Sequence, residues 1–149
     1  MKCSISTKGD RNLVKKPFNF RKLALESARI ADDKKCKDII VLNVHRLTTL
    51  CDYFVIATVE STPQMETVLS SIKKGMSEKG HYPLQWHGSV SLGTGLSSWQ
   101  VIDYGGVVVH LMMPQSREFY ALERMWYKAI KVNWLSPKPR HRRVKKRKK

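Results

Sequence analysis

The pattern of hydrophobic and polar positions divides the middle of the chain into alternating helices and strands. Alanines and leucines recur at helical spacing over 20–36, which predicts a first amphipathic helix. Two β-branched runs follow, over 38–44 and 52–59, and both are typical of strands buried on two faces. We therefore expect these runs to be central strands of a sheet.

A second helix is predicted from Ser61 to Gly80. Ser61 offers a hydroxyl N-cap and Pro63 suits the first helical position. Its apolar residues recur on one face: Met65, Val68, Leu69, Ile72 and Met76. This spacing assigns both methionines to the core of the protein rather than to a cofactor site.

A short strand is expected over 82–86, followed by a Gly/Ser-rich connection over 87–97. The glycines suggest a phosphate-binding loop, but such a loop needs a lysine directly before a helix. No lysine occurs between Lys79 and Lys128, so this interpretation is rejected.

The last part of the pattern predicts a β-hairpin and a helix. Strands over 98–103 and 106–113 flank a tight turn at Tyr104 and Gly105, and Pro114 ends the second strand. Ser116 is expected to cap a final helix, whose apolar face holds Phe119, Leu122, Trp126 and Ala129. The whole order predicts a mixed sheet of about five strands with helices packed on it, in the α/β or α+β class.

Charge changes this picture, because it is concentrated at the two ends. The 149 residues carry a net charge of +16, of which +6 lies in 1–22, +1 in 23–135 and +9 in 136–149. We therefore predict a nearly neutral domain over 23–135 between two basic extensions that lack the apolar content to fold alone. No apolar run is long enough to span a membrane.

The C-terminal extension is expected to be disordered when free and to attract polyanions. Its predicted RNA-phosphate contacts are Lys138, Arg140, Arg142, Arg143, Lys145, Lys146, Arg147, Lys148 and Lys149. A solubilising tail is the alternative interpretation. The N-terminal extension gives little support for an organellar transit peptide and lacks the apolar stretch of a secretory signal.

Cysteines and histidines indicate no catalytic or metal centre. Cys3, Cys36 and Cys51 form no CxxC pair, which suits a reducing cytosol and a role as small hydrophobic residues. The middle histidines, His45, His81, His87 and His110, lack metal-ligand spacing. A nucleophilic pair of Cys51 with His110 has no support in the sequence.

Gly88-Ser89 raises the question of a nucleotidyltransferase, which uses a Gly-Ser to hold triphosphate. Such enzymes also need an Asp-x-Asp pair for divalent cations, and neither Asp-x-Asp nor Glu-x-Asp occurs in the chain. Aromatic residues instead gather around the hairpin and the last helix: Trp99, Tyr104, Tyr120 and Tyr127, with His110. Together they favour a binding surface over a catalytic pocket.

Four linked motifs carry a family resemblance. They are A-x-x-K-K-x-x-D-I-x-V-L-x-V over 31–44, D-Y-F-V-I-A-T over 52–58, W-x-x-I-D-Y-G-x-V-V-V-H over 99–110 and R-x-F-Y-x-L-E-x-x-W over 117–126. In this order they closely resemble the ribosomal silencing factor family, also called RsfS or Iojap, across residues 23–134. Gly106, where the family often has an acid or Asn, and the basic extensions depart from it.

The resemblance implies a nucleotidyltransferase-like fold without its catalytic acids, and a function without catalysis or cofactor. Family members bind the large ribosomal subunit through its ribosomal protein number fourteen, block joining of the small subunit and so repress translation. Some also act in large-subunit biogenesis. A cytoplasmic location is expected, ahead of an organellar one.

Carried over by position, the resemblance implies these partner-binding residues: Trp99, Asp103, Tyr104, His110, Arg117, Phe119, Tyr120, Glu123 and Trp126. Aromatic faces would pack on the partner, Asp103 or Glu123 would pair with its basic side chains, and Phe119 and Trp126 would alternatively hold the helix on the sheet. A general RNA-binding or assembly protein acting through the tails stays open, as do a nucleotidyltransferase and a homodimer of the free chain.

Overall fold

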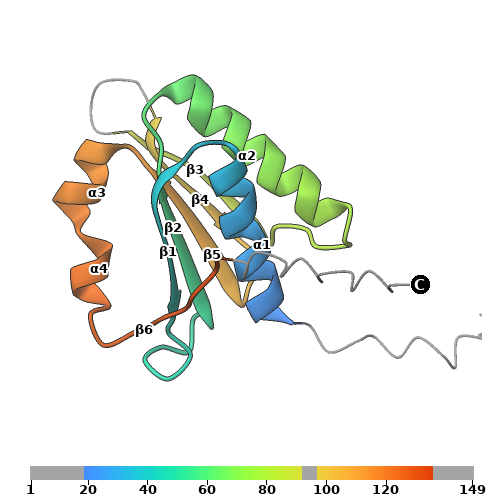
Figure 1. Ribbon diagram of the computed structural model, residues 1–149, viewed down its shortest axis with the longest axis vertical. Coiled ribbons are helices and arrows are strands. Elements are labelled where there is room, and N and C mark those ends of the chain that lie inside the picture. Colours follow the sequence, from blue (N-terminus) through green and yellow to red (C-terminus); the bar gives the residue numbers. More distant parts are fainter. Residues whose placement is uncertain (1–18, 92–96, 136–149) are drawn as a thin grey trace, which may run out of the picture.

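The computed structural model describes residues 19–91 and 97–135, apart from the side chains of 85–91 and 97, as three layers (Figure 1). A sheet forms the middle layer, with α1 (Phe20–Asp33) and α2 (Thr62–Ser77) on one face and α3 (Pro114–Tyr120) and α4 (Leu122–Met125) on the other. In the described part of the chain, no helix has the length and apolar character of a membrane span.

The sheet has six strands in the order β3-β4-β5-β2-β1-β6. Their bounds are β1 (Lys37–Asn43), β2 (Tyr53–Thr58), β3 (Gln85–Ser91), β4 (Ser97–Asp103), β5 (Val107–Met112) and β6 (Ile130–Lys131). The central pair β2 and β5 is parallel and all other pairs are antiparallel. The expected mixed sheet covered by helices is confirmed, as is the β4–β5 hairpin, whose turn has Gly105 at φ +85°.

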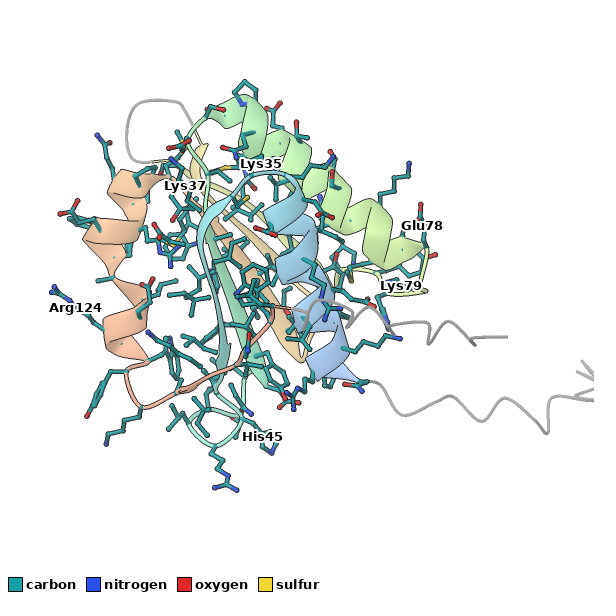
Figure 2. All side chains as sticks on the ribbon, viewed as in Figure 1. Lys35, Lys37, His45, Glu78, Lys79 and Arg124 are labelled. Carbon is teal, nitrogen blue, oxygen red and sulfur yellow. The ribbon has the colours of Figure 1, made fainter. Side chains whose placement is uncertain are left out.

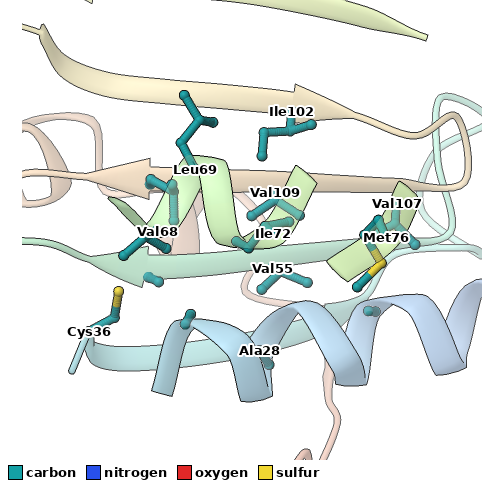
Figure 3. Packing of buried hydrophobic residues seen from close by; sticks show 14 of the residues in the cluster. Ala28, Cys36, Val55, Val68, Leu69, Ile72, Met76, Ile102, Val107 and Val109 are labelled. Atoms are coloured by element: carbon teal, nitrogen blue, oxygen red, sulfur yellow. The ribbon is translucent and has the colours of Figure 1, made fainter. Parts of the chain in front are cut away.

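The main core lies between the sheet and the pair α1 and α2 (Figure 3). Side chains of α2, among them Val68, Ile72 and Met76, pack on sheet residues such as Val55 and Val109. Met65 and Met76 are both fully buried, which confirms their assignment to the core. The alanine face of α1 is equally buried, and such small side chains let a helix approach the sheet closely.

The helix starts follow from local capping. Ser61 Oγ accepts a hydrogen bond from the Gln64 N–H at 3.2 Å and Pro63 lies in the first turn of α2, as the sequence predicts. The helix α1 starts at Phe20, three residues before the predicted domain boundary. There Asn19 Oδ1 accepts the Lys22 N–H at 3.0 Å.

A second, smaller core lies on the opposite face of the sheet, under α3 and α4. Its buried members are Leu42, Val44, Cys51, Ile56 and Met112. Half-buried aromatic and aliphatic side chains close it from the helix side: Tyr120, Leu122, Trp126 and Ala129. The sheet is therefore covered on both faces.

The strand β3 corrects the sequence prediction. A short strand over 82–86 and a loop from 87 were expected, whereas β3 covers Gln85–Ser91 and pairs antiparallel with β4. The register shifts between His87 and Val90, where Gly88 and Ser89 lie. Pairing with β4 overrides the low strand propensity of these residues, and the shift is typical of a β-bulge.

The end of the chain corrects a second prediction, because one continuous last helix was expected. Ser116 is not the N-cap: Met113 holds that position, Pro114 opens α3, and Ser116 is buried inside it. Ala121 adopts a left-handed conformation, with φ 42° and ψ 54°, and separates α3 from α4. The strand β6, which pairs with β1, was not expected at all.

Candidate functional site

A row of ring contacts leads from the inside of the sheet to the surface of α3. His110 on β5 lies with its ring centroid 5.7 Å from that of Trp99 on β4. Trp99 lies 4.7 Å from Tyr120, and Tyr120 lies 5.1 Å from Phe119, again between ring centroids. We call these four residues the aromatic row. Stacking and edge contacts of this kind hold each ring in one orientation.

The inner end of the aromatic row is fixed by a hydrogen bond. Trp99 Nε1–H donates to His110 Nδ1 at 3.2 Å, and the ring of Phe54 meets His110 edge-on at 5.3 Å. Burial lowers the pKa of His110 to about 4, so the imidazole is neutral at pH 7. A neutral ring that accepts at Nδ1 carries its proton on Nε2, so His110 positions Trp99 rather than reaching a partner itself.

The helix α3, which carries the outer end of the aromatic row, also holds one member of an ion pair. Arg117 Nε–H donates to Glu123 Oε1 at 2.8 Å, and Arg117 Nη2 lies 2.6 Å from the same oxygen. Arg117 Nη1–H donates to Thr58 Oγ1 at 2.7 Å. The Arg117 side chain is 11% exposed. These bonds connect α3 to α4 and to the end of β2. The charges of Arg117 and Glu123 are paired within the chain, and the pair stabilises the junction of α3 and α4 at Ala121, which we call the elbow.

The turn residues of the hairpin have internal roles as well. Asp103 Oδ1 accepts the Gly105 N–H at 2.7 Å, which closes the turn. The sequence suggested an exposed Tyr104, but its side chain is packed in the main core and only 4% exposed, and burial raises its pKa to about 12. His110 is likewise buried, at 9% exposed. His110 is hidden because its strand, β5, lies in the middle of a sheet that is covered on both faces.

Phe119 is the most exposed of the predicted partner-binding residues. The sequence placed it on the apolar inner face of the last helix, but the left-handed Ala121 ends that helix and leaves Phe119 76% exposed. Trp126 stays inside, with its ring centroid 5.2 Å from that of Phe54. The sequence prediction missed Met125, a large exposed apolar residue at the end of α4.

A hollow of about 530 Å³ lies beside the ion pair of Arg117 and Glu123. Residues of β1, β2 and the α3–α4 layer line it: Asp38, Ile40, Thr58, Pro114, Arg117, Glu118, Ala121, Glu123 and Arg124. Figure 2 shows Arg124 on the outer side of α4. Carboxylates and guanidinium groups alternate here with apolar carbon, which suits mixed contacts with a protein surface.

Residues with reactive or metal-binding chemistry do not gather in this region. Over 19–91 and 97–135, no group of three His, Cys, Asp or Glu residues is placed to hold a metal ion. Cys36 and Cys51 are buried free thiols, and burial raises the pKa of each to about 11. A thiol with such a pKa is not a nucleophile at pH 7.

Several predicted features lie outside the described residues. These are Cys3 and the rest of the N-terminal extension through residue 18, the loop glycines Gly93 and Gly95, the side chain of His87 and the predicted RNA-phosphate contacts of the tail. The expectations about them stay predictions.

The fold and the aromatic row define a class of protein: a three-layer α/β domain with an ordered aromatic surface on its α3 side. The sequence model of the family described as "Ribosomal silencing factor during starvation" matches residues 17–149, which confirms the resemblance of the four motifs. The chain belongs to the ribosomal silencing factor family. The match extends beyond the predicted 23–135 domain at both ends.

Named relatives and solved structures agree with this placement. The chain is 35% identical over 105 residues to ribosomal silencing factor RsfS of Chromobacterium violaceum, covering 70% of this chain and 80% of that protein. It is 36% identical over 110 residues to chloroplastic protein Iojap of Arabidopsis thaliana, covering 73% of this chain but only 43% of the plant protein. A crystal structure of a Chromobacterium violaceum protein matches with a TM-score of 0.60 at 33% identity, covering 72% of this chain and 82% of that one.

Proposed function

We propose that this chain binds the large ribosomal subunit, through ribosomal protein number fourteen, and sterically prevents the small subunit from joining. Membership of the ribosomal silencing factor family supports the ribosomal target. The observation that carries the choice of surface is the aromatic row, which ends on the exposed ring of Phe119. Aromatic anchors held in one orientation lose little entropy on binding, so they suit a protein interface.

Silencing of this kind needs no catalysis. A domain of this length has a radius of gyration of about 13 Å, which is thick enough to keep two subunit surfaces apart. The strength of repression is then set by affinity and residence time on the large subunit. The nucleotidyltransferase alternative instead predicts magnesium-dependent binding of a nucleoside triphosphate, and isothermal titration without such binding discards it.

Co-sedimentation with purified large subunits tests the proposal, followed by addition of small subunits. We expect the chain to sediment with large subunits and to lower the yield of joined ribosomes. Phe119→Ala should weaken both effects by roughly tenfold, the loss of about 1.4 kcal/mol of binding energy that a buried aromatic anchor supplies.

Tyr82→Ala is the matched control for Phe119→Ala. Tyr82 is another exposed aromatic residue, 69% exposed, but it lies between α2 and β3, away from the aromatic row. It should leave both effects unchanged. If the two variants behave alike, or if joining is unaffected while the chain sediments with large subunits, the proposed mechanism is wrong.

A second function, in building the large subunit, is favoured by a further relative. The chain is 31% identical over 94 residues to a mouse protein named "Mitochondrial assembly of ribosomal large subunit protein 1", covering 62% of this chain and 40% of that protein. If the chain acts in assembly, depleting it should cause large-subunit precursors to accumulate on sucrose gradients.

We also propose cytoplasmic ribosomes as the target, with the basic tail contacting ribosomal RNA.

A further inference from the structure

A second surface lies at the other end of the α3–α4 layer, where the loop between β1 and β2 meets the segment before β6 (Figures 1 and 2). A hollow of about 460 Å³ opens there. It is lined by Asn43, His45, Arg46, Leu47, Lys128 and Ile130. Figure 2 shows His45 at this end of the molecule. The fold thus joins two distant parts of the sequence in one site.

The charge of this hollow is positive. Arg46 and Lys128 both line it, and neither is in an ion pair with an acid within the described residues. The acid next to the loop, Asp52, is held by His45, whose Nδ1 lies 2.7 Å from Asp52 Oδ1. Two cations that line one hollow without a paired acid repel each other unless an anion lies between them, so the site is complementary to negative charge.

An exposed aromatic ring lies next to Lys128. Tyr127 is 74% exposed, and the Lys128 Nζ lies over its ring, 5.6 Å from the centroid. Leu47, Leu50 and Ile130 add exposed apolar area at the same end. Cations beside an open aromatic face are the combination with which proteins bind unpaired nucleic acid, because phosphates meet the cations while a base stacks on the ring.

We propose that this end of the molecule binds an unpaired strand of RNA. Arg46 and Lys128 contact its phosphates, and Tyr127 stacks on a base. An acidic peptide would use the two cations but make no use of the exposed Tyr127 ring, whereas RNA uses all three groups. The site is separate from the aromatic row, so it does not depend on the proposed contact with ribosomal protein number fourteen. It also uses none of the predicted contacts of the basic tail.

The test measures how the affinity of the full chain for a fluorescent unpaired RNA changes with salt. Arg46→Glu combined with Lys128→Glu removes two phosphate contacts. The slope of log affinity against log salt should then become shallower by about 1.4. Arg29→Glu combined with Lys74→Glu is the matched control, since it changes the net charge equally on the exposed faces of α1 and α2. The control should keep the original slope.

A second pair of variants tests the stacking contact. Tyr127→Ala should lower affinity about fivefold or more, which is the lower end of the effect of one stacked base, and Tyr127→Phe should retain it. Tyr82→Ala is the control ring and should have no effect. The proposal is overturned if both charge reversals change the slope equally, if Tyr127→Ala binds as well as the original chain, or if polyglutamate displaces the RNA as well as unlabelled RNA does.

Discussion

At the scale of single residues, Gly106 allows the ring of Phe20 to approach the hairpin turn closely. A side chain at Gly106 would overlap the ring of Phe20, the first residue of α1. The Gly106 carbonyl also accepts hydrogen bonds from the Asp52 and Tyr53 N–H groups, at 2.9 and 3.0 Å. These hydrogen bonds hold the backbone of the turn in place, and the ring of Phe20 packs against it. A larger residue at this position would require the Phe20 ring to shift.

Replacing this glycine should destabilise the protein. For Gly106→Asn we expect a loss of about 1–3 kcal/mol in the free energy of unfolding, because the new side chain displaces Phe20. Urea denaturation measures this loss. In a Phe20→Ala background the same substitution should cost much less. An equal cost in both backgrounds would show that Phe20 is not the cause.

His110 makes stability depend on pH. Its pKa in the folded protein, about 4, lies below its value of 6.5 in the unfolded chain, so folding favours the neutral ring. This contribution is fully present above pH 6.5 and is lost as the pH falls from 6.5 through 4. The difference between the two pKa values corresponds to about 3 kcal/mol.

Unfolding measured from pH 7 to pH 4 checks this prediction. His110→Gln should remove the part of the decline that the histidine causes, even though the variant is less stable at pH 7. His45→Gln is the control, because His45 is an exposed histidine paired with Asp52, and it should keep the decline. If His110→Gln declines as steeply as the original chain, protonation of His110 is not responsible.

At the scale of elements, the elbow at Ala121 decides which side chains the α3–α4 layer presents. An alanine in the left-handed region is strained by roughly 1–2 kcal/mol, since its Cβ approaches a backbone carbonyl. The ion pair of Arg117 and Glu123 spans the elbow and holds it against this strain. Because α3 ends there, Phe119 points outward while Leu122 and Trp126 pack on the sheet.

Ala121→Gly should therefore stabilise the protein by about 1 kcal/mol, because glycine adopts this conformation without strain. A rise in the thermal unfolding midpoint measures the effect. Ala28→Gly, inside α1, should act in the opposite direction and lower stability by about 1 kcal/mol or more. A lower midpoint for Ala121→Gly would contradict the strain argument.

Elements with a local signal were predictable. The capping hydroxyl and apolar face of α2 predicted that helix within a few residues, and Gly105 predicted the hairpin turn. Neither β3 nor the elbow has such a signal. The pairing partner of β3 is the strand β4, and Ala121 is an ordinary helix former. The conformations of β3 and the elbow depend on tertiary contacts, which the neighbouring residues in the sequence do not indicate.

At the scale of the whole molecule, the net charge of +16 divides into +6 over residues 1–22, +1 over 23–135 and +9 over 136–149. We expect deletion of residues 136–149 to weaken binding to large ribosomal subunits mainly at low salt. Counterion release makes phosphate contacts strongest there. Co-sedimentation across a salt series measures the change.

A scrambled tail of the same composition should restore binding, since a contact through charge alone does not depend on order. A tail of equal length with Ser and Gln in place of its basic residues should not restore it. Unchanged affinity at low salt after the deletion would show that the tail does not contact the subunit.

The sequence by itself determined the class of the fold, the distribution of charge along the chain and the family. Periodicity, turn residues and linked motifs are properties of neighbouring positions, so they can be recognised along the chain. Only the tertiary structure decided what each motif residue does. It buries Tyr104 and His110, pairs Arg117 with Glu123, exposes Phe119, and brings Arg46 and Lys128 to one hollow. These outcomes depend on contacts between strands and helices far apart in the sequence.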